Sequence, residues 1–347
     1  MSRLYLDWNA TAPLRPEARA AMVAAMDLVG NPSSVHAEGR AAKALLERAR
    51  AQVAAALGAE GADIIFTSGA TEAAALACAG RGLACAAIEH EAVAAWCEVS
   101  LPVDHTGAVG GSVPGRMALQ LANSETGVVQ DLPSGVAVTD LTQAFGKLPL
   151  AFNWLGCDMA LVSAHKLGGP KGVGALVLRQ GLDLAAQLRG GGQEMGRRAG
   201  TENLIGIAGF AAAAQAAARD LAAGLWDEVA EIRNILESAL SSAAPQTISV
   251  GKGAARLPNT LCLIAPGWKG ETQVMALDLA GFAVSAGSAC SSGKVRASKV
   301  LRAMGFDEAL SGQAIRVSIG PGVTKDDVLR FADAWTKAYA RALARAA

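Results

Sequence analysis

The sequence has little charge, and nothing in its charge balance indicates a partner such as nucleic acid or a membrane surface. Charged residues make up 18% of the 347 residues, and Lys plus Arg equal Asp plus Glu at 31, which leaves a formal net charge of +0. A polyanionic partner is therefore not expected. No run of about 18 or more apolar residues is free of charged or turn residues, so no membrane-spanning helix is expected either.

Cysteine is also scarce. The six cysteines form no CxxC pair, and the N-terminus lacks a basic region followed by an apolar signal core. Reduced thiols in the cytoplasm are the simplest interpretation, and no metal site is predicted. The cysteines are Cys78, Cys85, Cys97, Cys157, Cys262 and Cys290.

Apolar material is abundant, and 52% hydrophobic residues predict a globular protein with a large core. The length exceeds the range of about 250–300 residues at which a single core stops growing, so one large domain with a smaller companion is expected. We predict a large cofactor-binding domain over residues 13–250. Residues 1–12 and 251–347 would together form the small domain.

Buried strands alternate with helices through the first two thirds of the chain. Strands are predicted at 4–6, 63–67, 84–88, 136–139, 159–163 and 174–178, and helices at about 16–29, 38–57 and 204–242. Alternation of this kind predicts an α/β fold with a largely parallel sheet and a site at the carboxyl ends of its strands. Beyond residue 253 short strands mix with helices, which predicts a smaller α+β domain.

Lys166 carries the most specific chemistry. It ends the run Ser163-Ala-His-Lys166 after an apolar strand, and the Gly-rich segment 167–174 follows at once. Burial disfavours the ammonium form, so this amine can act as a nucleophile near neutral pH and form a Schiff base with the aldehyde of pyridoxal phosphate. Taken alone, the run fits a solvated loop lysine more often.

Polar residues follow three other predicted strands. Asp140 and Gln143 come after an apolar strand upstream of Lys166, and a carboxylate there could keep a pyridinium nitrogen protonated. His90 ends another strand, where an imidazole can stack on an aromatic cofactor and shuttle protons. A helix cap and a surface turn remain open as the alternatives for Asp140 and His90. After the strand 63–67, a glycine turn and helix start would present unpaired N–H groups to an anion.

Cys290 lies in a run of small residues from Ser285 to Gly293. Structural cysteines usually sit among larger apolar residues, as Cys262 does between two leucines. A thiol in a loop of small residues is therefore a candidate nucleophile.

Together these motifs resemble cysteine desulfurases of the NifS-like branch, within the class V (fold type I) enzymes that use pyridoxal phosphate. They occur in the family's order over nearly the whole chain, which is far more specific than any single motif. The matching runs are Tyr5-Leu-Asp-x-Asn-Ala-Thr11, Asn31-Pro-Ser-Ser-x-His36, Phe66-Thr-Ser-Gly-Ala-Thr-Glu72, Glu89-His90, Glu125-Thr-Gly-Val-Val-Gln130, Asp140-x-x-Gln143, Ser163-Ala-His-Lys166, Gly190-Gly-Gly-Gln-Glu194, Arg198-Ala-Gly-Thr-Glu-Asn203, Ser288-Ala-Cys290 and Ile315-Arg316.

The resemblance implies a large domain with a mostly parallel seven-stranded sheet, and roles for residues around the cofactor. Lys166 would hold pyridoxal phosphate as a Schiff base and then move the substrate's Cα proton. His90 would stack on the ring, Asp140 would pair with its nitrogen, and Gln143 would bind its oxygen. The phosphate would lie against Ala70, Thr71, Ser163 and His165.

The resemblance also implies a homodimer, in which Thr201 of the partner subunit reaches the phosphate. L-cysteine would be the substrate, with Arg316 on its carboxylate and Asn9 and Asn123 as further contacts. The thiolate of Cys290 would take the substrate sulfur as a persulfide and leave L-alanine. The sulfur would then pass to a protein acceptor, such as an iron–sulfur scaffold.

Several positions depart from the family pattern. Ser124 stands where a second asparagine is usual, and Trp8 and Pro321 replace polar residues near the expected substrate entrance. The connections 103–123 and 130–140 are too short for crossover helices, so they are predicted to be loops. These departures leave two alternatives open: a catalytically weakened paralogue that acts as a scaffold or binding partner in sulfur transfer, and another class V enzyme such as an aminotransferase or a selenocysteine lyase.

Overall fold

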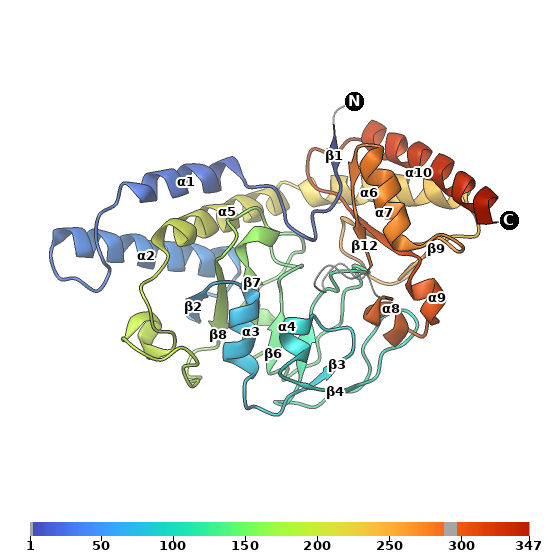
Figure 1. Ribbon diagram of the computed structural model, residues 1–347. Helices are drawn as coiled ribbons and strands as arrows, with labels where there is room; N and C mark the ends of the chain where they lie inside the picture. The colour runs from blue at the N-terminus through green and yellow to red at the C-terminus, as the bar shows by residue number, and fades with distance from the viewer. Residues whose placement is uncertain (1–2, 288–296, 347) are drawn as a thin grey trace.

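The computed structural model describes residues 3–287 and 297–346, and a mixed β-sheet lies at its centre (Figure 1). Four of its five strands point the same way, and β8 runs antiparallel to both of its neighbours. The five strands, in their order across the sheet, are β2 (Asp63–Thr67), β8 (Gly174–Leu178), β7 (Met159–Ser163), β6 (Val138–Asp140) and β5 (Ala118–Gln120).

The predicted α/β class is confirmed, with a qualification on the sheet. The strands β3 (Ala84–Ala86) and β4 (Glu98–Leu101) form a separate parallel pair, which a single parallel bridge between Ala84 and Met117 links to the main sheet. The main sheet has five strands, and the predicted number of seven is reached only when this pair is included. All of them except β8 then point the same way.

Helices cover both faces of the sheet, which explains why its strands are almost entirely apolar. Ile64 and Phe66 of β2 pack in one cluster with side chains of α2 (Ala37–Ala56) and α5 (Leu204–Ala222). Ile65, between them, packs in a second cluster with α3 (Ala70–Cys78) on the other face. The helix α1 (Pro16–Met26) lies along α5, and the short α4 (Glu91–Ala94) lies beside α3 (Figure 1).

The loops predicted in place of crossover helices are present. Residues 102–117, between β4 and β5, and residues 121–137, between β5 and β6, are all described and contain no helix. The parallel neighbours β5 and β6 are thus joined by a loop, as the short spacing required.

The single helix predicted over 204–242 is wrong. The chain forms α5 and then α6 (Leu225–Ala243), and Gly224 between them adopts φ +78° and ψ 11°. Glycine takes this left-handed conformation without steric cost, so it ends one helix and lets the next leave in a new direction. The apolar side of α6 packs against α10 (Lys325–Ala346).

The C-terminal part is built on a small antiparallel sheet, and the first strand of the chain, β1 (Leu4–Tyr5), pairs in parallel with β11 (Phe282–Ala283) beside it. The division into domains at residues 13 and 250 stays a prediction. The sheet consists of β12 (Ser285–Ala286), β13 (Ala314–Ser318), β10 (Thr260–Ile264) and β9 (Ile248–Ser249). The remaining helices are α7 (Gly270–Leu279), α8 (Lys299–Ala303), α9 (Glu308–Ser311) and the 3-10 turns η1 (Phe152–Trp154), η2 (Ala164–Lys166) and η3 (Gln193–Gly196).

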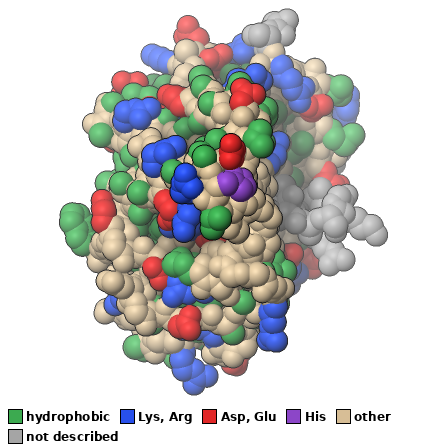
Figure 2. Space-filling model, turned by 90° about the vertical axis from the view of Figure 1, so that its left-hand side faces the viewer, with side chains coloured by type: hydrophobic (Ala, Val, Ile, Leu, Met, Phe, Trp, Pro, Cys, Tyr) green, Lys and Arg blue, Asp and Glu red, His purple; other side chains and the backbone are tan. Residues whose placement is uncertain are grey.

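On the face shown in Figure 2, Lys and Arg side chains alternate with Asp and Glu, and no large field of one sign forms there. Within residues 3–287 and 297–346, none of the helices combines the length and apolar character that crossing a bilayer demands.

Candidate functional site

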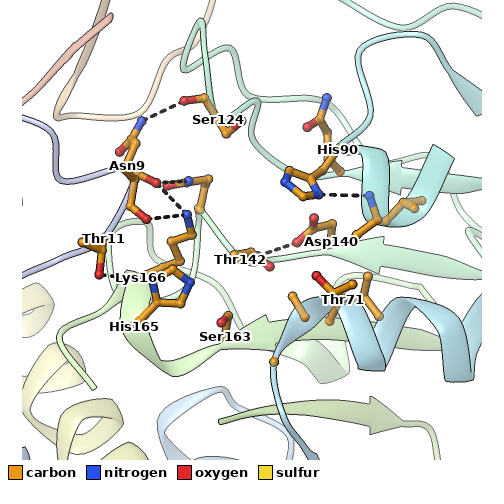
Figure 3. A pocket seen from close by; sticks show the side chains of 18 of the residues that line it. Asn9, Thr11, Thr71, His90, Ser124, Asp140, Thr142, Ser163, His165 and Lys166 are labelled. Atoms are coloured by element: carbon orange, nitrogen blue, oxygen red, sulfur yellow. Dashed lines mark hydrogen bonds between the residues drawn. The ribbon is translucent and has the colours of Figure 1, made fainter. Parts of the chain in front are cut away.

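A cavity of about 590 Å³ opens at the carboxyl ends of β5, β6 and β7. The N-terminus of α3 and the turn 9–11 complete its walls (Figure 3). Arg316, which belongs to β13, also lines it. Ten of the residues predicted for the site line this one cavity: Asn9, Ala70, Thr71, His90, Asp140, Gln143, Ser163, His165, Lys166 and Arg316.

Lys166 ends the η2 turn directly after β7 and points across the cavity toward the N-terminal turn (Figure 3). Its Nζ donates hydrogen bonds to the backbone oxygens of Asn9, at 2.8 Å, and Ala10, at 2.9 Å. The amine is half-buried. The amine of Lys166 is thus held at the carboxyl ends of the strands, where small molecules commonly bind in α/β folds.

Asp140 and His90 lie on the side of the cavity away from the N-terminal turn (Figure 3). Asp140 ends β6, and its Oδ1 accepts a hydrogen bond from the backbone N–H of Thr142 at 2.8 Å. His90 caps α4, and its Nδ1 accepts from the backbone N–H of Ala92 at 3.1 Å. This bond places the proton of a neutral imidazole on Nε2.

The first turn of α3 forms the end of the cavity that suits an anion. Its cap, Gly69, has φ +155° and no side chain, so the following N–H groups are not capped by a hydroxyl or carboxylate. A Cβ atom added at Gly174 would meet the Cα of Gly69 at 2.8 Å. Glycines therefore let β8 approach this turn closely, while the hydroxyls of Thr71 and Ser163 lie beside it (Figure 3).

His165 has a basicity far below that of a free histidine. Burial lowers its pKa to about 4, and the nearby charges of Lys166 and Lys171 add to the effect. Its Nδ1 lies 3.2 Å from the Oγ1 of Thr11. At neutral pH this imidazole is uncharged and acts through hydrogen bonds.

Arg316 is almost fully buried, with 5% of its surface exposed, and both Nη atoms of its guanidinium form hydrogen bonds. Nη2 donates to Asp7 Oδ1 at 2.7 Å, and Nη1 donates to the backbone oxygen of Ser124 at 3.0 Å. Nη2 also lies 3.2 Å from the Oγ of Ser285. Among the described residues, the Nε atom of Arg316 has no hydrogen-bond partner. The guanidinium is thus fixed in orientation while one donor remains unsatisfied.

Two of the predicted site residues that the structure describes are not brought to the cavity of this chain. Asn123 does not line it, because its amide caps a turn by accepting from the N–H groups of Glu125 and Thr126, both at 2.9 Å, and donating to the backbone oxygen of Ile88 at 3.0 Å. Thr201 is exposed and does not line the cavity either. Cys290 lies outside the described residues.

Two residues that the sequence did not single out for the site contribute to it. Ser124 lines the cavity, and its backbone oxygen binds both Asn9 and Arg316. Lys147 lies behind the wall with 2% of its surface exposed and binds Asn9 and Gln143. The departure of Ser124 from the family pattern was a usable signal, whereas nothing local distinguishes Lys147.

The polar groups around this cavity fit pyridoxal phosphate. The amine of Lys166 suits the aldehyde, the carboxylate of Asp140 suits a ring nitrogen that carries a proton, and the uncapped first turn of α3 suits the phosphate. These groups lie on different walls of one space, as a ring with substituents on several sides requires (Figure 3).

Similarity to known proteins extends over nearly the whole chain. The aminotransferase class-V family model matches residues 4–100 and 114–331. A cysteine desulfurase from Cereibacter sphaeroides is 39% identical over an alignment 369 positions long, which covers 95% of this chain and 94% of the relative. The cysteine desulfurase IscS of Dictyoglomus turgidum is 35% identical, covering 94% and 91%. The X-ray structure of a NifS-like protein from Rickettsia africae has a TM-score of 0.88 and 31% identity, and covers 97% of this chain and 99% of its own.

Proposed function

The chain belongs to the aminotransferase class-V family, and on this premise we propose that it is a cysteine desulfurase, which removes sulfur from L-cysteine and leaves L-alanine. The family depends on pyridoxal phosphate. One observation carries the proposal: Lys166, Asp140, His90 and Arg316 surround a single cavity in a chain that matches cysteine desulfurases along almost all of its length.

When bound, pyridoxal phosphate supplies an aldehyde that links covalently to an amine and a ring that accepts electrons from the substrate's Cα. Lys166 would hold the cofactor through its amine and afterwards carry the proton of Cα. Asp140 would keep a proton on the ring nitrogen, and His90 would cover the ring and exclude water. Thr71, Ser163, His165 and the first turn of α3 would bind the phosphate.

Arg316 would bind the carboxylate of L-cysteine. Its guanidinium is buried and already held by Asp7 and Ser124, so little side-chain entropy is lost when a second carboxylate binds. Gln143 would face the ring oxygen, because it lines the same cavity as Lys166 and Asp140. Asn9 supports this wall through its backbone oxygen and stays a proposed substrate contact.

Cys290 would perform the sulfur step. Its thiolate attacks the sulfur of the substrate, an S–S bond forms, and the substrate's Cβ–S bond breaks with its electron pair passing to the carbon skeleton, which takes up protons to become L-alanine. The product on the enzyme is a persulfide. It would pass to a protein acceptor, such as an iron–sulfur scaffold, in the cytoplasm.

The functional unit would be a homodimer in which Thr201 of the partner subunit completes the phosphate site. The support for this is the position of Thr201 outside its own cavity, on the exposed segment that follows Gly190-Gly-Gly-Gln-Glu194.

The test is to measure alanine and sulfide together from L-cysteine under a thiol reductant. We expect equal amounts from the wild type and a loss of both by about a hundredfold or more in Cys290→Ala, because a nucleophile is removed. Cys97→Ala, which removes a half-buried thiol outside the cavity, is the matched control and should keep both products. Alanine and sulfide that persist in Cys290→Ala, or a wild type that makes neither, would refute the proposal.

A further inference from the structure

We propose that Lys147 is a positioning residue for Lys166, acting through Gln143 and Asn9. The inference rests on the proposed function, because it takes Lys166 as the lysine that holds the cofactor. Lys147 lies in the turn after β6 and does not line the cavity. Its Nζ donates to Gln143 Oε1 at 2.8 Å and to Asn9 Oδ1 at 3.2 Å.

The surroundings of Lys147 are unusual for a lysine. Its exposed fraction is 2%, and both acceptors of its amine are uncharged amide oxygens. Burial, together with the charges of Lys166 and Arg316, holds the pKa of Lys147 well below its ordinary range. A side chain that is so costly to bury needs a function that a smaller apolar residue could not supply.

That function begins with the amide of Gln143. Lys147 presents N–H donors to this amide, so the oxygen of Gln143 must face it and the NH₂ group must point the other way. The Nε2 of Gln143 then donates to the backbone oxygen of Asn9 at 2.9 Å. Lys147 thereby decides which end of an amide on the cavity wall faces the cofactor.

The effect reaches Lys166 through Asn9. The backbone oxygen of Asn9 accepts from both Gln143 Nε2 and Lys166 Nζ, while its Oδ1 accepts from Lys147 and from Asn259 Nδ2 at 3.0 Å. Lys147 therefore holds residue 9 both through its side chain and, by way of Gln143, through the carbonyl that binds Lys166. Removing the amine would leave Gln143 Oε1 a buried acceptor without its donor, free to turn toward Lys166.

We expect Lys147→Met to weaken the affinity of the apoprotein for pyridoxal phosphate about tenfold, roughly the effect of one hydrogen bond. The pH midpoint of the bound cofactor's visible absorption band should rise by about one unit, because an oxygen that turns toward Lys166 favours the protonated form of its nitrogen. The other titratable groups on the cavity walls, which are unchanged in the variant, are His90, Asp140, His165, Lys171 and Arg316.

The experiment titrates the apoproteins of wild type, Lys147→Met and Lys252→Met with pyridoxal phosphate at several pH values and follows the visible band. Lys252 is an exposed lysine in the turn after β9 and is the matched control. If the wild type develops no band, the proposed function fails. If it does, and Lys147→Met has the same affinity and midpoint, only the positioning role of Lys147 is overturned.

Asn9→Ala is the second variant, in case Lys147→Met does not fold, because it removes one of the two acceptors of Lys147 and leaves the amine in place. It should raise the midpoint in the same direction, and an unchanged midpoint would contradict the inference. In the double variant the two losses of affinity should not add, since they act on one network. Fully additive losses would show that Lys147 and Asn9 act independently.

Discussion

Burial lowers the pKa of two basic side chains next to Lys166. In water, histidine takes up a proton in mildly acidic solution and lysine carries one at neutral pH. Burial lowers the pKa of both His165 and Lys147. Burial thus disfavours the charged forms of these two side chains beside the cavity where a phosphate and a carboxylate are expected.

His165 makes a pH dependence testable. Its pKa is about 4 in the folded chain against an ordinary value of 6.5, so below pH 6.5 the unfolded chain takes up a proton that the folded chain does not. Stability should therefore fall as the pH drops through this window. From pH 7 to pH 5 the apoprotein should lose about 1 kcal/mol more than His165→Gln, after discounting for the solvent access of the ring.

The measurement is urea unfolding of both apoproteins at the two pH values. His105→Gln, at an exposed position, is the matched control. Equal losses of stability in the wild type and His165→Gln would show that His165 is not held neutral by the fold.

The residues that could be predicted from the sequence are those whose chemistry is local. Asp140 ends β6, Lys166 and His90 come shortly after β7 and β3, and parallel strands bring their carboxyl ends together. Lys147 could not be predicted in this way, because its burial depends on Asn9, which lies 138 residues away in the chain. The caps formed by Asn123 likewise depend on a turn that the sequence did not specify.

At the scale of elements, the buried carboxylate of Glu194 anchors the segment that carries Thr201, in addition to the ion pairs that Arg197 and Arg198 make with Asp63 and Glu72. Glu194 and Met195 adopt φ +49° and +60°, which is costly for residues with a side chain. The carboxylate of Glu194 compensates by binding Arg50 in a fork, at 2.8 and 3.0 Å, and the backbone N–H of Phe66 at 2.9 Å. This anchor fixes a Gly-rich stretch to the edge of the sheet.

Glu194→Ala should release the segment. It leaves the guanidinium of Arg50 largely buried without its main partner, so we expect a loss of about 3–5 kcal/mol in the free energy of unfolding. Trypsin should also cleave faster after Arg197 and Arg198, as mass spectrometry of the fragments would show.

The control is Glu47→Ala, which removes the other carboxylate on Arg50. Glu47 has 53% of its side chain exposed and should cost about 1 kcal/mol or less. Similar losses for the two variants would contradict the anchoring role of Glu194.

Elements with a regular apolar pattern were predictable, and those set by a single residue or by pairing were not. The strands at 63–67, 159–163 and 174–178 lie where they were predicted. The break between α5 and α6 depends on Gly224 alone, within an otherwise continuous helical pattern. The sequence does not show that β8 runs antiparallel to β7, because strand direction is set by pairing within the sheet. The strand β4 was missed because three of its four residues are exposed.

Considered as a whole molecule, the chain builds its site from distant parts. The turn 9–11 comes from the N-terminal end, Lys166 and Asp140 from the central sheet, and Arg316 from the C-terminal sheet. The hydrogen bond from Arg316 to the backbone of Ser124 connects the C-terminal sheet to the loop that follows β5 of the central sheet. A dimer would extend the same principle by adding Thr201 of the partner subunit.

Mixed dimers test that arrangement. Lys166→Ala lacks the lysine that we propose holds the cofactor, and Thr201→Glu places a negative charge where the partner's phosphate is expected, so each homodimer should be inactive. A hybrid dimer combines one intact site, with Lys166 of one chain and Thr201 of the other, and one doubly defective site. Random pairing at equal amounts should therefore restore about a quarter of the wild-type rate.

The rate of alanine formation from L-cysteine would be measured after unfolding and refolding the two variants together, with native mass spectrometry to count the hybrids. Variants refolded separately and then mixed briefly are the control and should stay inactive. Hybrids that form without any recovered activity would mean that Thr201 serves its own chain. Thr201 would then have to reach the phosphate of its own protomer, although it is exposed and does not line the cavity of that protomer.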